Sequence, residues 1–195
     1  MNTILVELDN NKEPYIKKLT DDKIINITGE SGSGKSYYAQ QYQHNDNYII
    51  IDTDDVFARY ETAQGYNREF GTYLRAKYAE LPSLYNDFDL IYTEILTYFK
   101  DSSKIIVIDS ALLKYIKDIS NLRGILIIMR TSVNTCYQRC LERFNQRYPD
   151  ISEEKREKYA MRKKGIYKWY KKLNSFIEKI NDCNTCFKND IHLEK

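Results

Sequence analysis

The chain has 195 residues, of which 42% are hydrophobic and 30% are charged, and its formal net charge is +2, as is typical of one globular domain with a sizeable core. Its longest apolar runs span about six residues, far short of a membrane helix, and its N-terminus lacks a signal-peptide pattern, so we expect a cytoplasmic protein without a membrane partner. The near-neutral charge gives no general case for nucleic-acid binding, and no feature indicates an oligomeric state.

The predicted elements alternate between strand and helix along the chain. Residues 3–8 suit a short strand or an extended arm, and residues 14–20 suit a short helix. Apolar strands are predicted at residues 23–28, 48–52, 104–109, 124–129 and 183–187. Helices are predicted at residues 37–42, 54–62, 67–80, 83–100, 110–118, 132–147 and 152–181. Strand–helix alternation with continuous apolar strands predicts a parallel α/β sheet with right-handed crossovers.

The eight residues after the strand at 23–28 match the phosphate-binding loop pattern G-x-x-x-x-G-K-[ST] in full. They are Gly29, Glu30, Ser31, Gly32, Ser33, Gly34, Lys35 and Ser36. Glycines let the backbone turn tightly and point its N–H groups at phosphate oxygens. Lys35 would reach the β- and γ-phosphates, and the Ser36 hydroxyl would ligate Mg²⁺. A chance Gly/Ser turn is the alternative, but the preceding strand and the helix from Tyr37 favour ATP and Mg²⁺ binding by residues 29–37.

Carboxylates follow two of the predicted strands, at the edge where ligands bind in open parallel sheets. The run Asp52-Thr53-Asp54-Asp55 ends the second of these strands, and Asp109 ends the third. Close carboxylates repel one another, which is useful beside Mg²⁺ or a hydroxyl acceptor, although capping of the next helix by one of them is an alternative. We predict that Asp52 or Asp54 is catalytic, with Asp54 as base and Asp52 as its support, and that Asp109 helps to hold Mg²⁺.

Positive charge gathers in the last third of the chain, where twelve Lys/Arg and five Asp/Glu lie between Arg139 and Lys172. Arg139, Arg143 and Arg147 recur every four residues and would share one helical face. In phosphoryl transfer such arginines stabilise charge on the transferring group, by about 10³-fold or more in known cases. Pairing with neighbours such as Glu142 is the alternative. We therefore predict a basic lid region at residues 136–172, with Arg139 and Arg143 as catalytic candidates.

In this order the motifs resemble the small-molecule and nucleotide kinases of the phosphate-loop class, and they are most similar to the dephospho-CoA kinases. Residues 24–59 are similar to that family's phosphate loop and D-x-D strand end, and residues 105–113 to its V-L-D-x-P-L-L turn. Residues 136–144 are similar to its Q-x-x-R-x-x-x-R lid helix. The resemblance implies that Asp54 activates the acceptor hydroxyl and that the two lid arginines close over the phosphates. Residues 60–100 depart from the family, so the kinase class is better indicated than the acceptor.

We interpret the chain as one P-loop NTPase-type domain over residues 1–195. The predicted architecture is a three-layer α/β/α fold with a five-stranded parallel sheet, a helical lid and a helical acceptor-binding insertion at residues 56–100. The predicted function is an ATP-dependent kinase acting on a small metabolite or nucleotide, either dephospho-CoA-like or a nucleoside or nucleotide. Two alternatives are a kinase of nucleic-acid ends or macromolecular precursors, similar to polynucleotide kinases or zeta-type toxins, and an ATPase switch without acceptor.

Overall fold

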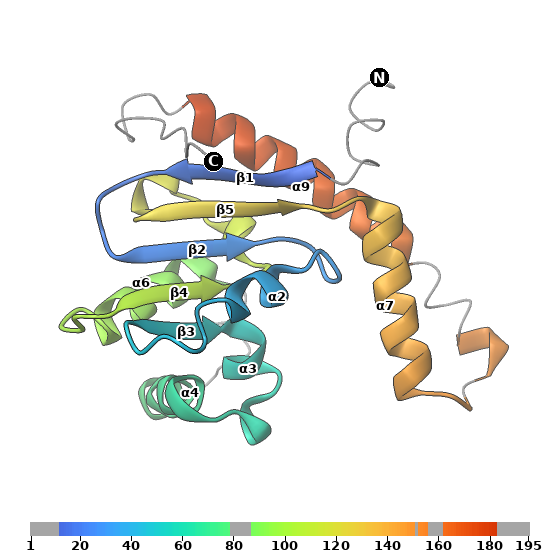
Figure 1. Ribbon diagram of the computed structural model, residues 1–195, viewed down its shortest axis with the longest axis horizontal. Helices are drawn as coiled ribbons and strands as arrows, with labels where there is room; N and C mark the ends of the chain where they lie inside the picture. Colours follow the sequence, from blue (N-terminus) through green and yellow to red (C-terminus); the bar gives the residue numbers. More distant parts are fainter. Residues whose placement is uncertain (1–11, 79–86, 151, 156–161, 183–195) are drawn as a thin grey trace.

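The computed structural model describes residues 12–78, 87–150, 152–155 and 162–182. Five strands form one sheet in the order β1-β5-β2-β4-β3 (Figure 1). Their bounds are Lys12–Lys18 for β1, Ile24–Thr28 for β2, Tyr48–Asp52 for β3, Ile105–Asp109 for β4 and Ile125–Arg130 for β5. Strands β2 to β5 pair in parallel, as predicted, so their carboxyl ends meet at one edge of the sheet.

The prediction of an entirely parallel sheet is wrong at β1, which pairs antiparallel with β5. The short helix predicted at residues 14–20 is wrong for the same reason, because this segment is the edge strand. Its register shifts between Lys12 and Tyr15, on either side of Pro14. Proline has no N–H to donate, so within sheets it occurs on edge strands and at such irregularities. The strands predicted at residues 3–8 and 183–187 lie outside the described residues.

The helices largely follow the predicted ranges. Their bounds are Lys35–Gln40 for α2, Thr53–Phe57 for α3, Gly65–Lys77 for α4, Phe88–Tyr98 for α6, Val133–Arg147 for α7 and Arg162–Asp182 for α9. The described residues also form three short 3-10 helices: η1 at Tyr60–Thr62, η2 at Leu113–Tyr115 and η3 at Ile119–Asn121. The helix predicted at 110–118 is wrong. The 3-10 helix η2 makes a single turn there, and the backbone leaves the helical region at Ile116, where ψ is 125°.

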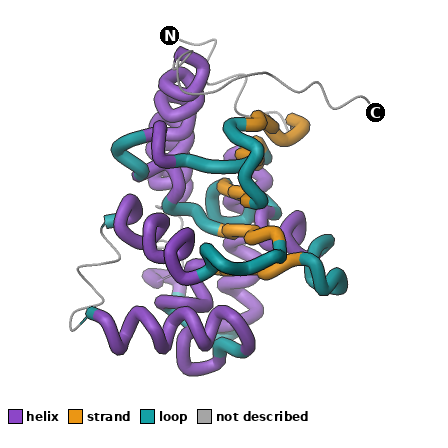
Figure 2. The backbone as a smooth tube through the Cα atoms, turned by 90° about the vertical axis from the view of Figure 1, so that its left-hand side faces the viewer, coloured by secondary structure: helices purple, strands orange, loops and turns teal. Residues whose placement is uncertain are grey.

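The two faces of the sheet are covered unequally. One face packs against α4, α6 and α9 through buried side chains such as Phe70, Ile91, Ile95 and Phe176. The opposite face carries Ile25, Ile27, Val107 and Ile127, and among the described residues it is covered mainly by α2, around Ala39. Figure 2 shows the strands nearly end-on, as a twisted stack with helices beside it. The predicted layers are therefore present, with a thin one on the α2 side.

None of the described helices combines the length and the apolar character needed to cross a bilayer. The longest of them, α9, carries several lysines and packs against α7. In Figure 1, α7 stands beyond the carboxyl ends of the parallel strands. The edge at which β2, β3 and β4 end therefore faces a basic helix, and the predicted site residues gather there.

Candidate active site

The predicted phosphate loop connects β2 to α2 at the carboxyl edge of the sheet. Gly32 and Gly34 have φ angles of 83° and 93°, in the left-handed region that side chains with a Cβ rarely adopt. A Cβ on Gly32 would also lie 2.5 Å from the backbone oxygen of Cys136 in α7. Glycine is required at Gly32 because the loop both turns sharply and touches α7.

Hydrogen bonds inside and around the loop fix its shape. The Ser33 N–H donates to the Glu30 carbonyl at 3.0 Å, and the Ser31 N–H donates to the Glu30 carboxylate at 2.9 Å. The Thr131 hydroxyl, just beyond β5, donates to the Ser33 carbonyl at 2.6 Å. The Ser31 amide therefore already donates to a carboxylate oxygen of the loop itself. The neighbouring Tyr37 is 84% exposed, and its side chain lies on the solvent side of α2.

Lys35, Ser36 and Asp109 come together at the start of α2, although Asp109 is more than 70 residues away in sequence. Burial raises the pKa of Asp109, while the Lys35 charge and a hydrogen bond from Ser36 act in the opposite direction. Among the described residues its buried Oδ1 has no hydrogen-bond partner. A buried carboxylate oxygen beside a hydroxyl is a suitable donor set for Mg²⁺, which prefers hard oxygen ligands.

The protein ligands available for Mg²⁺ are few. Within the described ranges, no group of three or more His, Cys, Asp or Glu side chains is arranged to hold a metal ion. Ser36 and Asp109 supply two oxygens, and Mg²⁺ commonly completes its octahedron with water and substrate phosphates. These residues therefore fit an ion that is bound together with a nucleotide.

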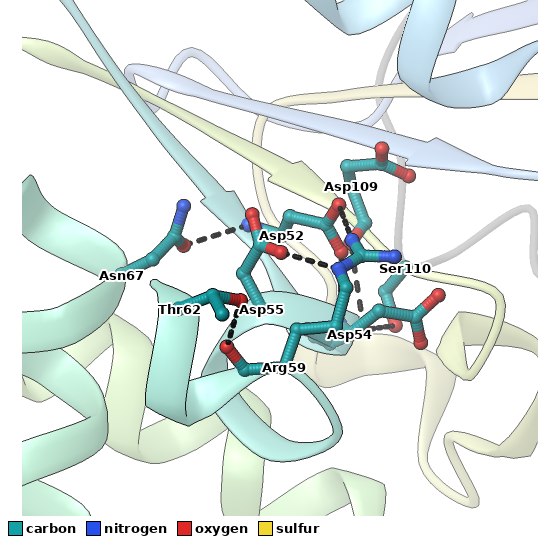
Figure 3. Close-up of polar contacts among 9 residues, drawn as sticks. Asp52, Asp54, Asp55, Arg59, Thr62, Asn67, Asp109 and Ser110 are labelled. Carbon is teal, nitrogen blue, oxygen red and sulfur yellow. Dashed lines mark hydrogen bonds and ion pairs between the residues drawn. The ribbon is translucent and has the colours of Figure 1, made fainter. Parts of the chain in front are cut away.

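Asp52 caps α3 and is held firmly by its neighbours (Figure 3). Its carboxylate accepts from the Asp54 N–H at 2.8 Å and pairs with Arg59 at 2.8 Å, and its own N–H donates to the Asn67 side chain at 2.9 Å. Burial, and then the charge of Asp109, raise the pKa of Asp52 to about 6. Asp52 is therefore the cap of this helix, and it lies next to Asp109.

Asp54 and Asp55 differ in what their carboxylates contact. Asp55 accepts from Arg59 Nε at 2.6 Å, so Arg59 bridges Asp52 and Asp55 (Figure 3). Among the described residues, the Asp54 carboxylate has no hydrogen bond or ion pair, yet its charge raises the pKa of both Asp52 and Asp109. Asp54 therefore lies close to both carboxyls without being held by a side-chain contact of its own among the described residues.

Two buried hydroxyls that the sequence patterns did not single out join the ends of β3 and β4. Thr53 Oγ1 donates to Ser110 Oγ at 3.0 Å, and Ser110 Oγ accepts from the Leu112 N–H at 3.1 Å. This small network fixes Asp52 opposite Asp109 across the two strands. No local pattern in the sequence indicated this network, because its two hydroxyls meet only when β3 and β4 pair.

The two arginines predicted to belong to a lid, Arg139 and Arg143, differ in position. Arg139 Nη1 donates to the Gly32 carbonyl at 3.1 Å, so this side chain reaches the phosphate loop. Arg143 instead donates to the Arg139 carbonyl at 3.3 Å and contacts Cys140 Sγ at 3.5 Å, both on its own helix. Within the described ranges neither arginine forms an ion pair with Glu142. Of the two candidates, Arg139 is the one placed beside the loop.

A polar cavity of about 430 Å³ opens on the α2 side of the sheet. At one end it is lined by Ser36, Asp52, Asp55 and Asp109, which places it against the carboxylates described above. The rest of its lining is made by Ala39, Gln40, Tyr42, Gln43, Asn45, Asp46, Tyr48, Ile50, Gln64, Tyr66, Asn67 and Lys104. Sequence patterns could not reveal this cavity, because its walls come from α2, β3, α4 and the start of β4.

The two arginines of α4, Arg68 and Arg75, stack on Tyr60 and do not line this cavity. The Arg68 and Arg75 guanidinium carbons lie 3.9 and 3.2 Å from the centroid of the Tyr60 ring. Both arginines also donate to backbone carbonyls, including that of Tyr60. This stack ties η1 to α4, and from residues 60–75 the cavity is lined by Gln64, Tyr66 and Asn67 instead.

Lys114 is a further residue near the loop that sequence reasoning missed. It lies in η2 and is half-buried, with Nζ donating to the Ala111 carbonyl at 2.7 Å. Burial lowers the pKa of Lys114 to about 7; Glu30 opposes this shift, and the charges of Lys172 and Lys35 add to it. No local pattern could indicate this cluster, because its members come from the loop, η2 and α9.

Comparison with known proteins leaves the family open. No family model and no curated protein matches the chain. Nine chains of solved structures match it. A chain of the Pnkp1/Rnl/Hen1 RNA repair complex is 16% identical, with a TM-score of 0.47, covering 82% of this chain and 46% of that one. TT1252 from Thermus thermophilus is 18% identical, with a TM-score of 0.46, covering 80% of this chain and 85% of that one.

The chain thus spans less than half the length of the first of these neighbours. Both TM-scores are below 0.5.

Proposed function

We propose that this protein is an ATP-dependent phosphotransferase that moves the γ-phosphoryl group of ATP to a small metabolite or nucleotide. One observation carries the proposal: the phosphate loop, the Lys35–Ser36–Asp109 group and the Asp52–Asp54 pair occupy the same edge of the sheet. A phosphate-binding loop alone serves hydrolysis as well as transfer. A carboxylate with an open position beside it supplies the base that a hydroxyl acceptor needs.

The residues take distinct roles in this reaction. The loop amides and Lys35 bind the β- and γ-phosphates, and Ser36 and Asp109 would hold Mg²⁺, which neutralises phosphate charge when bound. Asp54 accepts the proton of the acceptor hydroxyl as its oxygen bonds to the γ-phosphorus. The bond from that phosphorus to the β–γ bridging oxygen breaks, and ADP leaves. Asp52 positions α3, and Arg139 adds positive charge at the loop.

The cavity beside α2 supports an acceptor of nucleoside or nucleotide character. Its walls combine Tyr48 and Tyr66 with amide side chains such as Gln43 and Asn67, and it ends at Asp52 and Asp55. Aromatic rings stack on bases, and amides hydrogen-bond base edges. A dephospho-CoA-like acceptor also carries an adenine nucleotide, and the order of the motifs along the chain supports that finer assignment.

A second candidate function is phosphorylation of a nucleic-acid end. It is favoured by the exposed basic residues of α7 and α9, which adjoin the loop through Arg139. Phosphate contacts to a polymer release counterions, so its affinity would fall steeply as salt increases. Acceptor affinity in 50 and 200 mM NaCl separates the two: a small acceptor loses little, whereas an oligonucleotide bound at several phosphates loses at least about tenfold.

The test of the proposed function compares the wild type with Lys35→Met and, as a matched control, with Lys100→Met, a 69% exposed lysine remote from the loop. Calorimetry with Mg·ATP and transfer of ³²P from [γ-³²P]ATP to nucleosides, nucleotides and dephospho-CoA are the readouts. We expect binding and transfer in the wild type and in the control, and loss of both in Lys35→Met. Hydrolysis without any labelled acceptor would instead support the ATPase switch.

A further inference from the structure

The cavity beside α2 runs along β3 and β4, from their carboxyl ends to their amino ends. Asp52 and Asp109, which end these two strands, line it at the carboxyl edge of the sheet. Tyr48, which begins β3, and Lys104, which directly precedes β4, line it at the amino edge. Asp109 is five residues beyond Lys104, or about 16 Å at the rise of a parallel strand. The cavity is therefore long enough for an elongated ligand.

Lys104 is the one cationic side chain among the described residues that line this cavity. It is half-buried, and its Nζ lies 3.4 Å from the Tyr66 hydroxyl and 5.5 Å from the centroid of the Tyr66 ring. Asp46, which lines the cavity too, is exposed to water and forms no ion pair with Lys104 within the described ranges. A partly buried ammonium group without a carboxylate partner favours a ligand that brings its own negative charge.

Positive charge continues beyond Lys104, away from the phosphate loop. Lys104 also lines a second cavity, of about 260 Å³, at the amino ends of β2 and β4. The other charged residues that line this second cavity are Asp22, Lys23, Lys100 and Arg123. Three further cations and one carboxylate thus lie past Lys104, whereas carboxylates gather at the opposite end of the larger cavity. This polarity suits a ligand with a hydroxyl at the carboxylate end and an anionic group at the lysine end.

We propose that Lys104 is a specificity-determining residue, which binds a phosphate group of the acceptor at the end of the cavity remote from Asp52 and Asp109. This inference rests on the proposed function, because it takes the larger cavity as the acceptor site. The acceptor is then a phosphorylated compound and not a neutral nucleoside. Its phosphate is carried either by a nucleoside monophosphate or by the diphosphate of a dephospho-CoA-like compound. Tyr66 holds the Lys104 ammonium group at the cavity wall.

The experiment measures acceptor binding by calorimetry in the presence of excess Mg·AMP-PNP, a non-hydrolysable analogue that keeps the probes out of the phosphate loop. The probes are the four common ribonucleosides, the 5′-monophosphate of each, and dephospho-CoA. The variants are Lys104→Met, Lys104→Gln, Lys104→Arg and the control Lys179→Met, an exposed lysine on α9 that lines neither cavity. Thermal melting confirms that each variant is folded, and titration with Mg·AMP-PNP alone confirms that its nucleotide site is intact.

At least one phosphorylated probe should bind the wild type about tenfold or more tightly than the corresponding nucleoside, because hydrogen bonds from an ammonium group to phosphate are among the strong ones. Lys104→Met should lose this preference, while its affinity for the nucleosides stays that of the wild type. Lys104→Arg, which keeps the charge, should retain the preference, and Lys179→Met should match the wild type. A preference for a monophosphate assigns the shorter acceptor, whereas a preference confined to dephospho-CoA assigns the longer one.

A wild type without this preference, or a preference that persists in Lys104→Met, would overturn the proposal. So would equal weakening of nucleosides and phosphorylated probes, since Lys104 would then support the cavity wall and not bind phosphate. Should Lys104→Met not fold, Lys104→Gln decides by the same criteria. Failure of the proposed function is distinct, because it appears as unchanged Mg·ATP binding in Lys35→Met or as absence of ³²P transfer, and neither result depends on Lys104.

Discussion

Asp52 and Asp109 lie directly opposite each other at the carboxyl ends of β3 and β4, as paired residues of the parallel ladder. Burial raises the pKa of both carboxyl groups, and the charge of Asp109 raises that of Asp52 further. Such a pair is unfavourable for stability alone. Under the proposed function, the position of Asp109 beside Lys35 and Ser36 suits a divalent cation that is bound together with the nucleotide.

Asp54→Asn should abolish transfer while preserving Mg·ATP binding. The amide cannot accept the acceptor's proton, so we expect turnover to fall by about 10²–10⁴-fold. Asp101→Asn is the control, since this 91% exposed carboxylate lies outside the lining of the cavity. Steady-state kinetics together with calorimetry measure both effects. Normal turnover in Asp54→Asn would remove Asp54 from the mechanism.

Asp52→Asn should change how the free energy of unfolding depends on pH in metal-free buffer. The folded pKa of Asp52, about 6, exceeds the ordinary value of 3.8, so the folded state holds this proton to higher pH than the unfolded chain. The wild type should therefore lose stability relative to the variant as pH rises from about 4 to 6, and the difference should stay constant above that range. Its size is at most about 3 kcal/mol, since one pKa unit corresponds to about 1.36 kcal/mol.

Urea unfolding with EDTA at pH 4, 5, 6 and 7 measures this difference. Asparagine can still cap α3, so the helix start is preserved in the variant. Asp101→Asn, which removes a side chain that is 91% exposed, should run parallel to the wild type. If the curves of Asp52→Asn and the wild type are also parallel, the raised pKa is wrong.

Gly32→Ala should destabilise the fold and weaken nucleotide binding together. The positive φ and the approach of the Cys136 carbonyl leave no room for a methyl group, so we expect a loss of about 1–3 kcal/mol. Gly165→Ala is the control: an added Cβ meets nothing within 4 Å on α9, and alanine favours helix by up to about 1 kcal/mol. Equal melting temperatures for the two variants would contradict this reading of the loop.

Arg139→Ala should lower kcat by up to about 10³-fold, because it removes the guanidinium that contacts the loop. Arg147→Ala, which removes an exposed arginine two turns farther along the same helical face, should leave kcat nearly unchanged. We measure kcat and KM for ATP in both variants. A fall in kcat indicates a charge that acts on the reacting group, whereas a rise in KM indicates general attraction of the nucleotide. Similar losses of kcat in the two variants would mean that the arginines of α7 only attract the nucleotide in general.

Much of the parallel sheet could be predicted because the patterns that mark its strands lie within short stretches of the sequence. Continuous apolar runs marked β2 to β5, and the loop pattern located the turn between β2 and α2. The edge strand β1 could not be predicted in the same way. Its residues are strand only because β5 offers an unpaired edge, and a segment containing Pro14 also suits a helix start when that partner is unknown.

The sequence by itself determined the phosphate loop and the carboxylates at the strand ends, since each is a short pattern beside a recognisable strand. Only the tertiary structure decided which carboxylates meet, that Asp52 is held by Arg59 while Asp54 stays open, and that Lys114 and Lys172 share one aromatic ring. The physical reason is the separation along the chain over which each effect acts. Backbone turns and strand propensities act between near neighbours, whereas charge, burial and cavities depend on residues that the fold brings together from distant parts of the chain.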